Sequence, residues 1–383
     1  MLASLVGFLQ KPSIAVRLDG DDTRFSPEEF PNVVFAAAGK VQGKIHLIHD
    51  VDEGSSLGQI SSRVWVSKES DKDDVRVRTS FENKTFTYTL EGPTRFSALS
   101  IYHETLIQVP RSTTFMNSLR VDAPNTSFSG NDLLGLNWGS VTSQLINSSI
   151  TFQTLSADAL SLRTSNASIS GSFDAGQIEL QTSNSAISAK LRVKEDIHGR
   201  QSVVSTKTSN SSITLHVSAV EAIHGLWMDT VTKNGKINVG ALLGQFNTQS
   251  SFINLRTENS RIELNLDASQ TRQPLEVNTK TSNATVESSI MVPRGEVFKC
   301  VVETSNSSAN LNLTEDVQGQ FEVETCNSSA TVEGSGLSFD KDKKSYKAGT
   351  RGLGQSNVKV ATSNASANLR FYPAGDSLAT SHY

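Results

Sequence analysis

The segment Thr164-Ser165-Asn166-Ala167-Ser168-Ile169 recurs with small changes along the C-terminal part of this 383-residue chain. Successive copies place their asparagines 18, 26, 24, 25, 24, 23, 21 and 37 residues apart. A near-constant period of this length is typical of a solenoid, in which each repeat forms one coil. The asparagines of the nine copies are Asn166, Asn184, Asn210, Asn234, Asn259, Asn283, Asn306, Asn327 and Asn364.

Polar and apolar residues alternate on both sides of each asparagine. In the third copy, Val204 and Thr208 precede Asn210 by six and two residues, and Ile213 follows it by three. Alternation with period two predicts a half-buried strand before and after the asparagine. The alternation shifts by one residue across the Ser-Asn pair, which predicts a tight corner with Asn in the left-handed conformation.

Each repeat therefore reads as strand, corner, strand and return. One repeat cannot bury its apolar column, but stacked repeats bury a continuous one. We expect an all-β fold, a parallel β-solenoid of about ten coils, right-handed by the usual preference of crossover connections. Parallel stacking would also bring the nine corner asparagines into register as a ladder of amides.

The chain before the repeats has a different pattern. Short alternating segments such as Phe86-Thr87-Tyr88-Thr89-Leu90, separated by turn-forming residues, predict antiparallel hairpins that cap the first coil. The expected organisation is a partly disordered leader at 1–30, an antiparallel β cap at 31–110, solenoid repeats at 111–372 with an insertion at 335–357, and a tail at 373–383. Provisional corners at Asn125 and Asn147 extend the repeats toward the N-terminus.

Composition excludes several classes of protein. The net charge is −4 with a pI near 6.0, whereas a nucleic-acid-binding protein is expected to carry a basic face. No apolar run has the length of a membrane span. The apolar N-terminus, Met1 to Leu9, lacks basic residues and a clear cleavage site, so the cytoplasm is the default and the cell surface or secretion the alternative.

The two cysteines, Cys300 and Cys326, occupy different places on the coil, so we expect them to be unpaired. Asn-x-Ser/Thr sequons recur along the chain, but most of them belong to corners of a Ser-rich repeat. Whether they are glycosylated stays open. A monomer is expected.

The order of the segments resembles a known family. Asp74-Val75-Arg76-Val77-Arg78 and the alternating segment ending at Leu90 come first, and Leu106-Ile107-Gln108-Val109-Pro110 then opens the Thr-Ser-Asn repeats. This resembles the "putative adhesin" family, the auto-transporter adhesin head-like domains of bacteria with related fungal domains of unknown function, over roughly residues 60–371. The family commonly has Gly after the Asn, which only Asn234 keeps here. The resemblance implies a β-solenoid and little about activity.

Candidate metal ligands are few. A calcium loop starting at Asp19 would need an acid at its twelfth position, where the chain has Phe30. Glu195 and His198, and in the next coil Glu221 and His224, occupy equivalent turns and could together bind a metal. A third such turn has Gln318 in the His position, which favours a structural turn. We therefore predict no metal site and no cofactor.

Two functions remain. The first is a non-catalytic structural or interaction protein with a protein or glycan partner. The alternative is a polysaccharide lyase or hydrolase, since such enzymes need carboxylates that converge from neighbouring coils. Glu263 with Glu287, and Glu303 with Glu324, are the available pairs, and neither has an aromatic residue beside it. We predict no catalytic residue. The lysines Lys341, Lys343, Lys344 and Lys347 are expected to be solvated, with an anionic partner as the alternative.

Overall fold

The computed structural model describes residues 14–16, 18, 22–50, 55–93, 101–131, 133–245, 248–292 and 295–373. These residues form the strands β1 to β31 and one short 3-10 helix, η2 (Glu69–Asp74). The chain divides into two compact units, Met1–Ser170 and Gly171–Tyr383. Among the described residues, no helix is long and apolar enough to cross a membrane.

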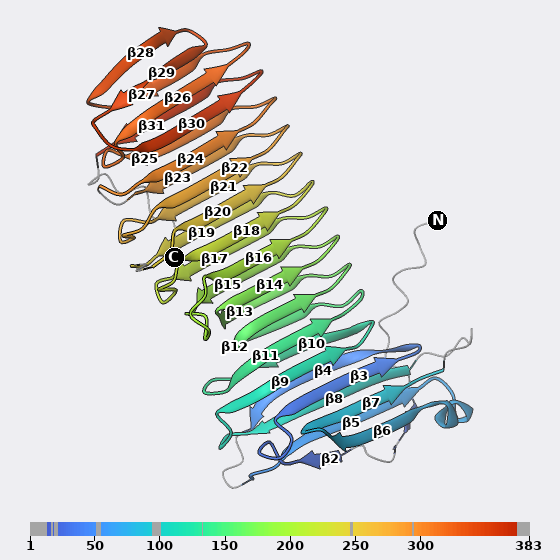
Figure 1. Ribbon diagram of the computed structural model, residues 1–383. Coiled ribbons are helices and arrows are strands. Elements are labelled where there is room, and N and C mark those ends of the chain that lie inside the picture. Colours follow the sequence, from blue (N-terminus) through green and yellow to red (C-terminus); the bar gives the residue numbers. More distant parts are fainter. Residues whose placement is uncertain are drawn as a thin grey trace, which may run out of the picture. The chain divides into compact units, whose positions relative to one another are not determined.

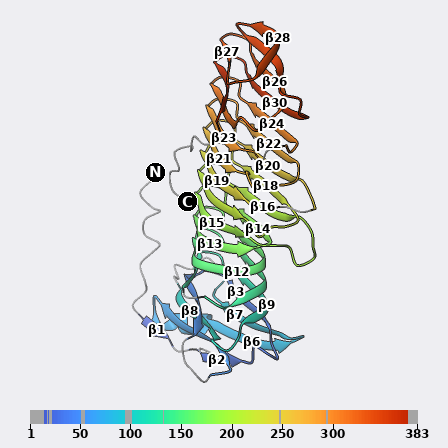
Figure 2. The ribbon, with the colours of Figure 1, turned by 90° about the vertical axis from the view of Figure 1, so that its left-hand side faces the viewer.

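Two parallel sheets face each other in the second unit, and Figure 2 shows even-numbered strands on one side and odd-numbered strands on the other. We call the even-numbered side the first sheet; in spatial order it contains β14 (Gln177–Gln181), β16 (Ser202–Lys207), β18 (Leu226–Val231), β20 (Ser251–Arg256), β22 (Leu275–Lys280), β24 (Phe298–Glu303), β30 (Ser356–Thr362) and β26 (Gly319–Thr325). The second sheet contains β15 (Ile187–Val193), β17 (Ile213–Ala219), β19 (Ile237–Leu243), β21 (Ile262–Asp267), β23 (Val286–Met291), β25 (Ala309–Thr314), β31 (Ala367–Tyr372) and β27 (Ala330–Glu333). β13 (Ile169–Ala175) begins at the boundary between the units.

Like residues stack on like in these sheets. Ile213 is in register with Ile237, which in turn is in register with Ile262, and all three side chains are fully buried. Thr214, the next residue along the strand, is only half-buried because it points outward. The parallel β-solenoid and the inward column of apolar residues are therefore confirmed. The handedness of the coils stays a prediction.

The corners join each coil to its neighbour through side-chain hydrogen bonds. The amide Nδ2 of each corner asparagine donates to the Oδ1 of the asparagine in an adjacent coil, as from Asn259 to Asn234 at 2.7 Å. The hydroxyl of the threonine two residues before the corner donates to a backbone carbonyl in the same neighbouring coil, as from Thr281 to Ser260 at 3.0 Å. In the second unit the amide bonds run in the spatial order Asn184, Asn210, Asn234, Asn259, Asn283, Asn306, Asn364 and Asn327. In the first unit they link Asn125, Asn147 and Asn166.

The predicted left-handed conformation is wrong for most corners. Among the described residues other than glycine, only Asn83, Lys84, Asn125 and Asn147 have a positive φ. The nine repeat asparagines therefore bend without it. Their backbone is fixed instead by the preceding coil: the N–H groups of Lys233 and Asn234, for example, both donate to the carbonyl of Ser209. The bend is spread over several residues, so no single one has to adopt a strained φ.

The last coil of the chain is not the last coil of the stack. Strands β30 and β31 lie between β24/β25 and β26/β27, and pair in parallel with both. The chain thus forms the outer coil at 319–333 first and then returns to fill the layer beneath it (Figure 1). The corner asparagines follow this spatial order, since Asn364 bonds both Asn306 and Asn327 at 2.7 Å.

A hairpin closes this end of the second unit. The segment expected as an insertion at 335–357 contains β28 (Leu337–Lys343) and β29 (Tyr346–Arg351), which pair antiparallel, and β29 also pairs antiparallel with β26. Lys347 forms an ion pair with Asp342, and Lys341 lies over the ring of Tyr346, 5.4 Å from its centroid. A charged, exposed outer strand protects a sheet edge from pairing with another chain.

The first unit is arranged in the same way at its own end. β3 (Asn32–Ala38) pairs in parallel with β7 (Thr85–Glu91) and β9 (Phe115–Asp122), and β4 (Val41–Asp50) with β8 (Ile101–Pro110) and β10 (Thr126–Asn131). β11 (Asn137–Gln144) and β12 (Ile150–Arg163) continue the stack. The first coil of the chain therefore lies between two others, as the last coil does.

Each antiparallel pair found in the described part of the first unit includes a strand outside this stack. β5 (Gly58–Val66) pairs antiparallel with β8, with β1 (Ile14–Val16) and with β2 (Asp22–Phe25), and β6 (Arg76–Glu82) pairs antiparallel with β7. A hairpin cap is present, but the expected antiparallel cap over all of 31–110 is too broad, because β3, β4, β7 and β8 form parallel coils. The expected leader at 1–30 contains β1 and β2. Residues 1–13, 17 and 19–21 of it, and all but the first residue of the expected tail at 373–383, lie outside the described residues.

Substituting one inward and one outward residue of β17 tests the assignment of the two sides of a strand. Ile213→Asp places an unpaired carboxylate in the fully buried column and should lower the free energy of unfolding by at least ~3 kcal/mol. Thr214→Asp adds the same charge to the outer surface and should cost less than ~1 kcal/mol. Urea denaturation followed by circular dichroism gives both values, and equal losses would contradict the orientation.

The amide ladder makes a second prediction. Asn259 bonds both Asn234 and Asn283, whereas the ladder ends at Asn327, which bonds Asn364. Asn259→Ala should therefore lower the free energy of unfolding by about 1–2 kcal/mol, and Asn327→Ala by about half of that. Thermal and urea unfolding measure the difference. If the ladder contributed nothing to the free energy of unfolding, both variants would be as stable as the parent protein.

Candidate functional site

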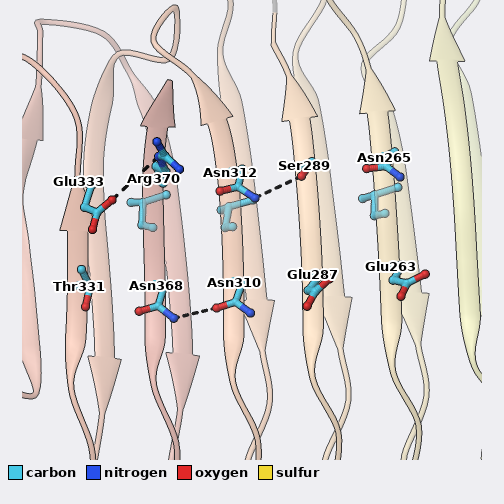
Figure 3. Close-up of a pocket in the computed structure, with 13 residues that line it drawn as sticks. Glu263, Asn265, Glu287, Ser289, Asn310, Asn312, Thr331, Glu333, Asn368 and Arg370 are labelled. Atoms are coloured by element: carbon cyan, nitrogen blue, oxygen red, sulfur yellow. Dashed lines mark hydrogen bonds and ion pairs between the residues drawn. The ribbon is translucent and has the colours of Figure 1, made fainter. Parts of the chain in front are cut away.

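A shallow depression of about 440 Å³ lies on the outer surface of the second sheet, across β21, β23, β25, β31 and β27. Figure 3 shows two rows of polar side chains that cross these strands. The rows come from the fourth and sixth residues after each corner asparagine, which point outward by the alternation of the strand. The first row contains Glu263, Glu287, Asn310, Asn368 and Thr331, and the second contains Asn265, Ser289, Asn312, Arg370 and Glu333.

Hydrogen bonds link neighbours within each row (Figure 3). Asn368 donates to Asn310 at 2.7 Å, and Asn312 donates to the hydroxyl of Ser289 at 3.3 Å. At the end of the second row, Arg370 and Glu333 are 3.9 Å apart. The depression thus offers amide and hydroxyl groups in a regular array, and it is suited to bind polar groups rather than to activate one.

The acid pair Glu263 and Glu287 does lie on adjacent strands, in register. Both carboxylates are held by cations: Glu263 contacts Lys236 at 2.6 Å and Arg261 at 2.9 Å, and Arg261 also bonds Glu287. A glycosidase requires one carboxyl group to be protonated and the other to be free to act as a nucleophile or base. Here the guanidinium of Arg261 bonds both carboxylates, so the two acids are held by one cation instead of being left open to a substrate.

The prediction that Glu303 and Glu324 are neighbours is wrong. Strand β30 lies between their strands, so Ala361 is in register with both. Glu303 bonds Lys280 at 2.8 Å, and Glu324 bonds Lys359 at 2.8 Å. The misplacement follows from the inserted last coil, because spatial neighbours there are not neighbours in the order of the chain.

A contact between the imidazole of His224 and the carboxylate of Glu195 joins the paired turns that contain His198 and His224. His224 Nε2 lies 3.1 Å from a carboxylate oxygen of Glu195, and its Nδ1 lies 2.8 Å from the hydroxyl of Thr248. Glu221 instead bonds Arg192 at 2.5 Å. No group of three acidic, histidine or cysteine side chains in the described part of the chain could hold a metal ion.

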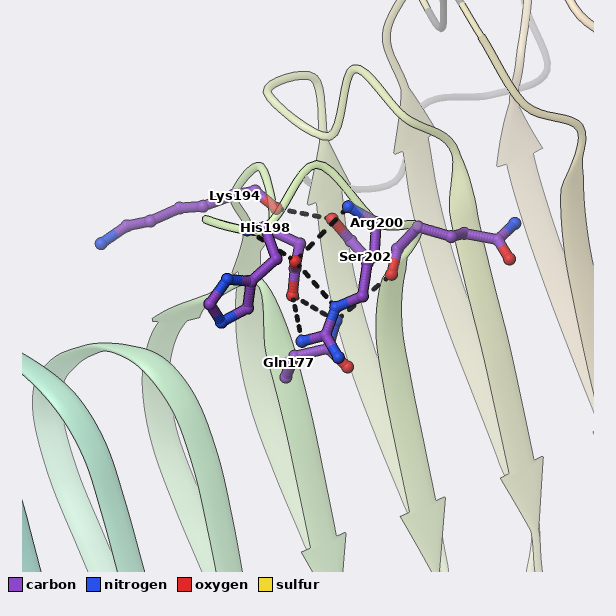
Figure 4. A network of polar contacts seen from close by, with 7 residues as sticks. Gln177, Lys194, His198, Arg200 and Ser202 are labelled. Carbon is purple, nitrogen blue, oxygen red and sulfur yellow. Dashed lines mark hydrogen bonds and ion pairs between the residues drawn. The ribbon is translucent and has the colours of Figure 1, made fainter.

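Asp196 organises the turn that contains His198. Figure 4 shows the side chains of Gln177, His198 and Arg200 at this turn. The carboxylate of Asp196 is almost fully buried and accepts bonds from the guanidinium of Arg200 at 3.1 Å, from the backbone N–H of His198 at 2.9 Å and from Gln177 at 2.9 Å. The bonds from Arg200, with those from His198 and Gln177, hold the pKa of Asp196 well below its usual range although burial opposes this. These contacts occupy both oxygens, so this acid shapes a turn.

The first unit has a buried histidine without access to solvent. His103 is fully buried; its Nδ1 lies 2.8 Å from the hydroxyl of Thr105 and its Nε2 3.1 Å from that of Thr126. Burial lowers its pKa to about 3, so the imidazole is neutral in the folded protein. Ser62 also bonds Thr105, at 2.8 Å. This chain of polar groups satisfies hydrogen bonds inside the core.

The two cysteines are free. Cys300 is buried in the apolar column, where burial raises the pKa of its thiol, and Cys326 is exposed at a corner. A buried thiol with a raised pKa is a poor nucleophile.

Comparison with known proteins gives structural neighbours only. No family model and no curated protein matches the chain. A "putative cell adhesion protein" from Clostridium sporogenes ATCC 15579 is 8% identical with a TM-score of 0.18, over 92% of this chain and 98% of that one. A "putative adhesin" from Parabacteroides merdae ATCC 43184 is 10% identical with a TM-score of 0.29, over 74% and 98%. Another from Bacteroides fragilis NCTC 9343 is 8% identical with a TM-score of 0.25, over 95% and 100%. At these identities and TM-scores, function has to be argued from the surface of the protein itself.

The cations that occupy the acid pair were not singled out from the sequence. Lys236 and Arg261 both stand two residues after a corner asparagine, so the repeat alignment already placed them in one column. The column two residues after the corner has to be compared with the column four residues after it to find these ion pairs, since the side chains of the two columns contact each other within a strand and across neighbouring strands.

The carboxylate of Asp196 makes a prediction about acid stability. Asp196→Asn should lower the free energy of unfolding by about 2 kcal/mol at pH 7, because bonds to the charged carboxylate are lost. Its folded pKa is depressed, so this contribution is present above the ordinary aspartate pKa of roughly 4 and is lost as pH falls below it. The difference between parent and variant should therefore shrink on acidification. Urea denaturation at a series of pH values measures it.

Asp73→Asn serves as the matched control, since Asp73 is exposed and has no ion pair among the described residues. Its effect should be small and flat over the same pH range. A constant difference for Asp196→Asn down to strong acid would contradict the role given to its charge.

Proposed function

We propose that this chain is a non-catalytic interaction protein of the adhesin-like kind, in which a rigid β-solenoid presents polar sheet surfaces to a partner. The observation that carries the proposal is that the candidate catalytic acids are all bonded to cations. Each of Glu263, Glu287, Glu303 and Glu324 forms an ion pair with a lysine or arginine on an open surface. Glycoside hydrolysis needs a proton donor and a second carboxylate that both reach the substrate, whereas each carboxylate here is bonded to a neighbouring cation.

The shape of the surface supports the same function. Enzyme sites usually lie in concave pockets that exclude water. The depression in the second sheet is shallow, and its polar groups repeat at the strand spacing of roughly 4.8 Å. A repeated array of amides and hydroxyls suits an extended partner that contacts several coils at once. Membership in the adhesin-like family that the repeats resemble is part of this proposal.

Binding and turnover of polysaccharides separate this function from the enzymatic alternative. The full-length protein should be retained on one or more immobilised glycans or partner proteins, while released reducing ends and unsaturated sugars stay at the level of the blank. Retention and product release are measured on the same panel of neutral and acidic polysaccharides.

A double substitution, Glu263→Gln with Glu287→Gln, is the control for trace activity. A second variant combines Glu303→Gln with Glu324→Gln. The proposal is overturned if the parent protein releases product and either double variant does not. Variants should first be shown to unfold at a temperature close to that of the parent, because each substitution also removes ion pairs.

A further inference from the structure

Two aromatic side chains lie against each other on the outer surface of the first sheet. Trp227 of β18 and Phe252 of β20 are in register, with ring centroids 4.5 Å apart and planes inclined by 32°. Trp227 is 45% exposed, whereas Trp138 is fully buried. Leaving an aromatic pair in water costs hydration free energy, so exposed apolar groups that lie together indicate a contact surface.

Hydrogen-bonding groups follow directly along the same strands. Asp229 and Asn254 stand two residues after Trp227 and Phe252, so they point to the same side of the sheet. Asn254 donates to one carboxylate oxygen of Asp229 at 2.6 Å. No other hydrogen bond to these two side chains is found within the described residues. The second carboxylate oxygen, the amide oxygen and the second amide hydrogen can therefore serve a ligand with hydroxyl groups.

Positive charge comes next in the same direction. Lys207, Val231 and Arg256 lie on adjacent strands in register, two residues after the row of Asp229, and line a depression of about 310 Å³. Neither Lys207 nor Arg256 forms an ion pair with any described residue, whereas the nearby Lys233 contacts Glu258 at 3.8 Å. Two cations without a carboxylate partner are complementary to an anionic ligand.

These groups form a track with three zones. Trp227 and Val231 are four residues apart on one strand, which is roughly 13 Å, and Lys207 and Arg256 are two strands apart, which is roughly 10 Å. The track thus runs from an apolar ring surface, through acceptors and donors for hydroxyl groups, to a positively charged end. We propose that it binds an acidic glycan, with one pyranose ring on Trp227, hydroxyl groups at Asp229 and Asn254, and a carboxylate or sulfate at Arg256 and Lys207.

A glycan fits this surface better than a nucleic acid does. Stacked aromatics and cations would also suit single-stranded DNA or RNA. However, the carboxylate of Asp229 lies between the aromatic pair and the cations, where a glycan offers hydroxyl groups as hydrogen-bond donors and a DNA backbone offers only phosphate and sugar acceptors. The inference rests on the proposed function, because it names the class of partner for one surface of the interaction protein.

Titration of the full-length protein with defined oligosaccharides tests the track. The probes are trigalacturonic acid, a heparin-derived tetrasaccharide, the neutral maltotriose and a short oligothymidylate, measured by isothermal calorimetry and by tryptophan fluorescence. Trp227→Ala and Arg256→Ala should each weaken binding of an acidic oligosaccharide at least tenfold, about 1.4 kcal/mol. Trp227→Phe should retain part of the affinity, and added salt should weaken binding because the contact to the anion is screened.

Lys299→Ala is the matched control, since Lys299 is an exposed lysine on β24 of the same sheet, outside the track. It should bind as the parent does. The inference is overturned if no acidic oligosaccharide binds, if Trp227→Ala and Arg256→Ala bind as tightly as the parent, or if the oligothymidylate binds more tightly than both acidic glycans. These results do not affect the proposed function if the protein is still retained on another immobilised partner. Cleavage of one of the oligosaccharide probes, in contrast, would overturn the proposed function itself. Carboxylated and sulfated probes together distinguish the two possible sources of negative charge.

Discussion

The hydrogen bonds between successive corners are the interaction on which the other features depend. At each layer an asparagine amide, a threonine hydroxyl and two backbone N–H groups all bond to the adjacent coil. This combination sets the register of one coil on the next, and a slip of one residue would turn every apolar side chain outward. Because the register is fixed at the corner, the strands on both sides can carry almost any polar residue on their outer surface.

The repeated Thr-Ser-Asn segment was enough to predict the strands, the inward columns and the solenoid. The period reports the local geometry of each coil, and that geometry is the same in every copy. The left-handed corner was wrong because the bend is stabilised by contacts with another coil, which a single-residue preference cannot represent. Asn125 and Asn147, outside the Thr-Ser-Asn copies, do have the positive φ that local preference favours.

Spatial order was the part that the sequence did not reveal. Glu303 and Glu324 belong to consecutive copies of the repeat, yet Ala361 of the last copy separates them. The repeat period is the same whether a coil stacks on the coil before it in the chain or inserts between two earlier coils. The outer surfaces were predicted in part: the acid columns were found, but the cations beside them and the aligned Trp227 and Phe252 were not, because each lies in a column that was not compared across copies.

The position of the last coil of the chain, and that of the first, affects how the protein unfolds. A repeat array normally frays from its ends, since a terminal repeat has one neighbour. Here the coil at 356–372 has a neighbour on each side, as does the coil at 32–50 in its own unit. Detaching either coil breaks its strand pairing with two neighbouring coils at once, so each coil should slow the unfolding of its end of the unit. For the coil at 356–372, assembly has the corresponding requirement, because both of its neighbours precede it in the chain and it has to enter between them. This favours slow completion of folding and slow unfolding once the coil is in place.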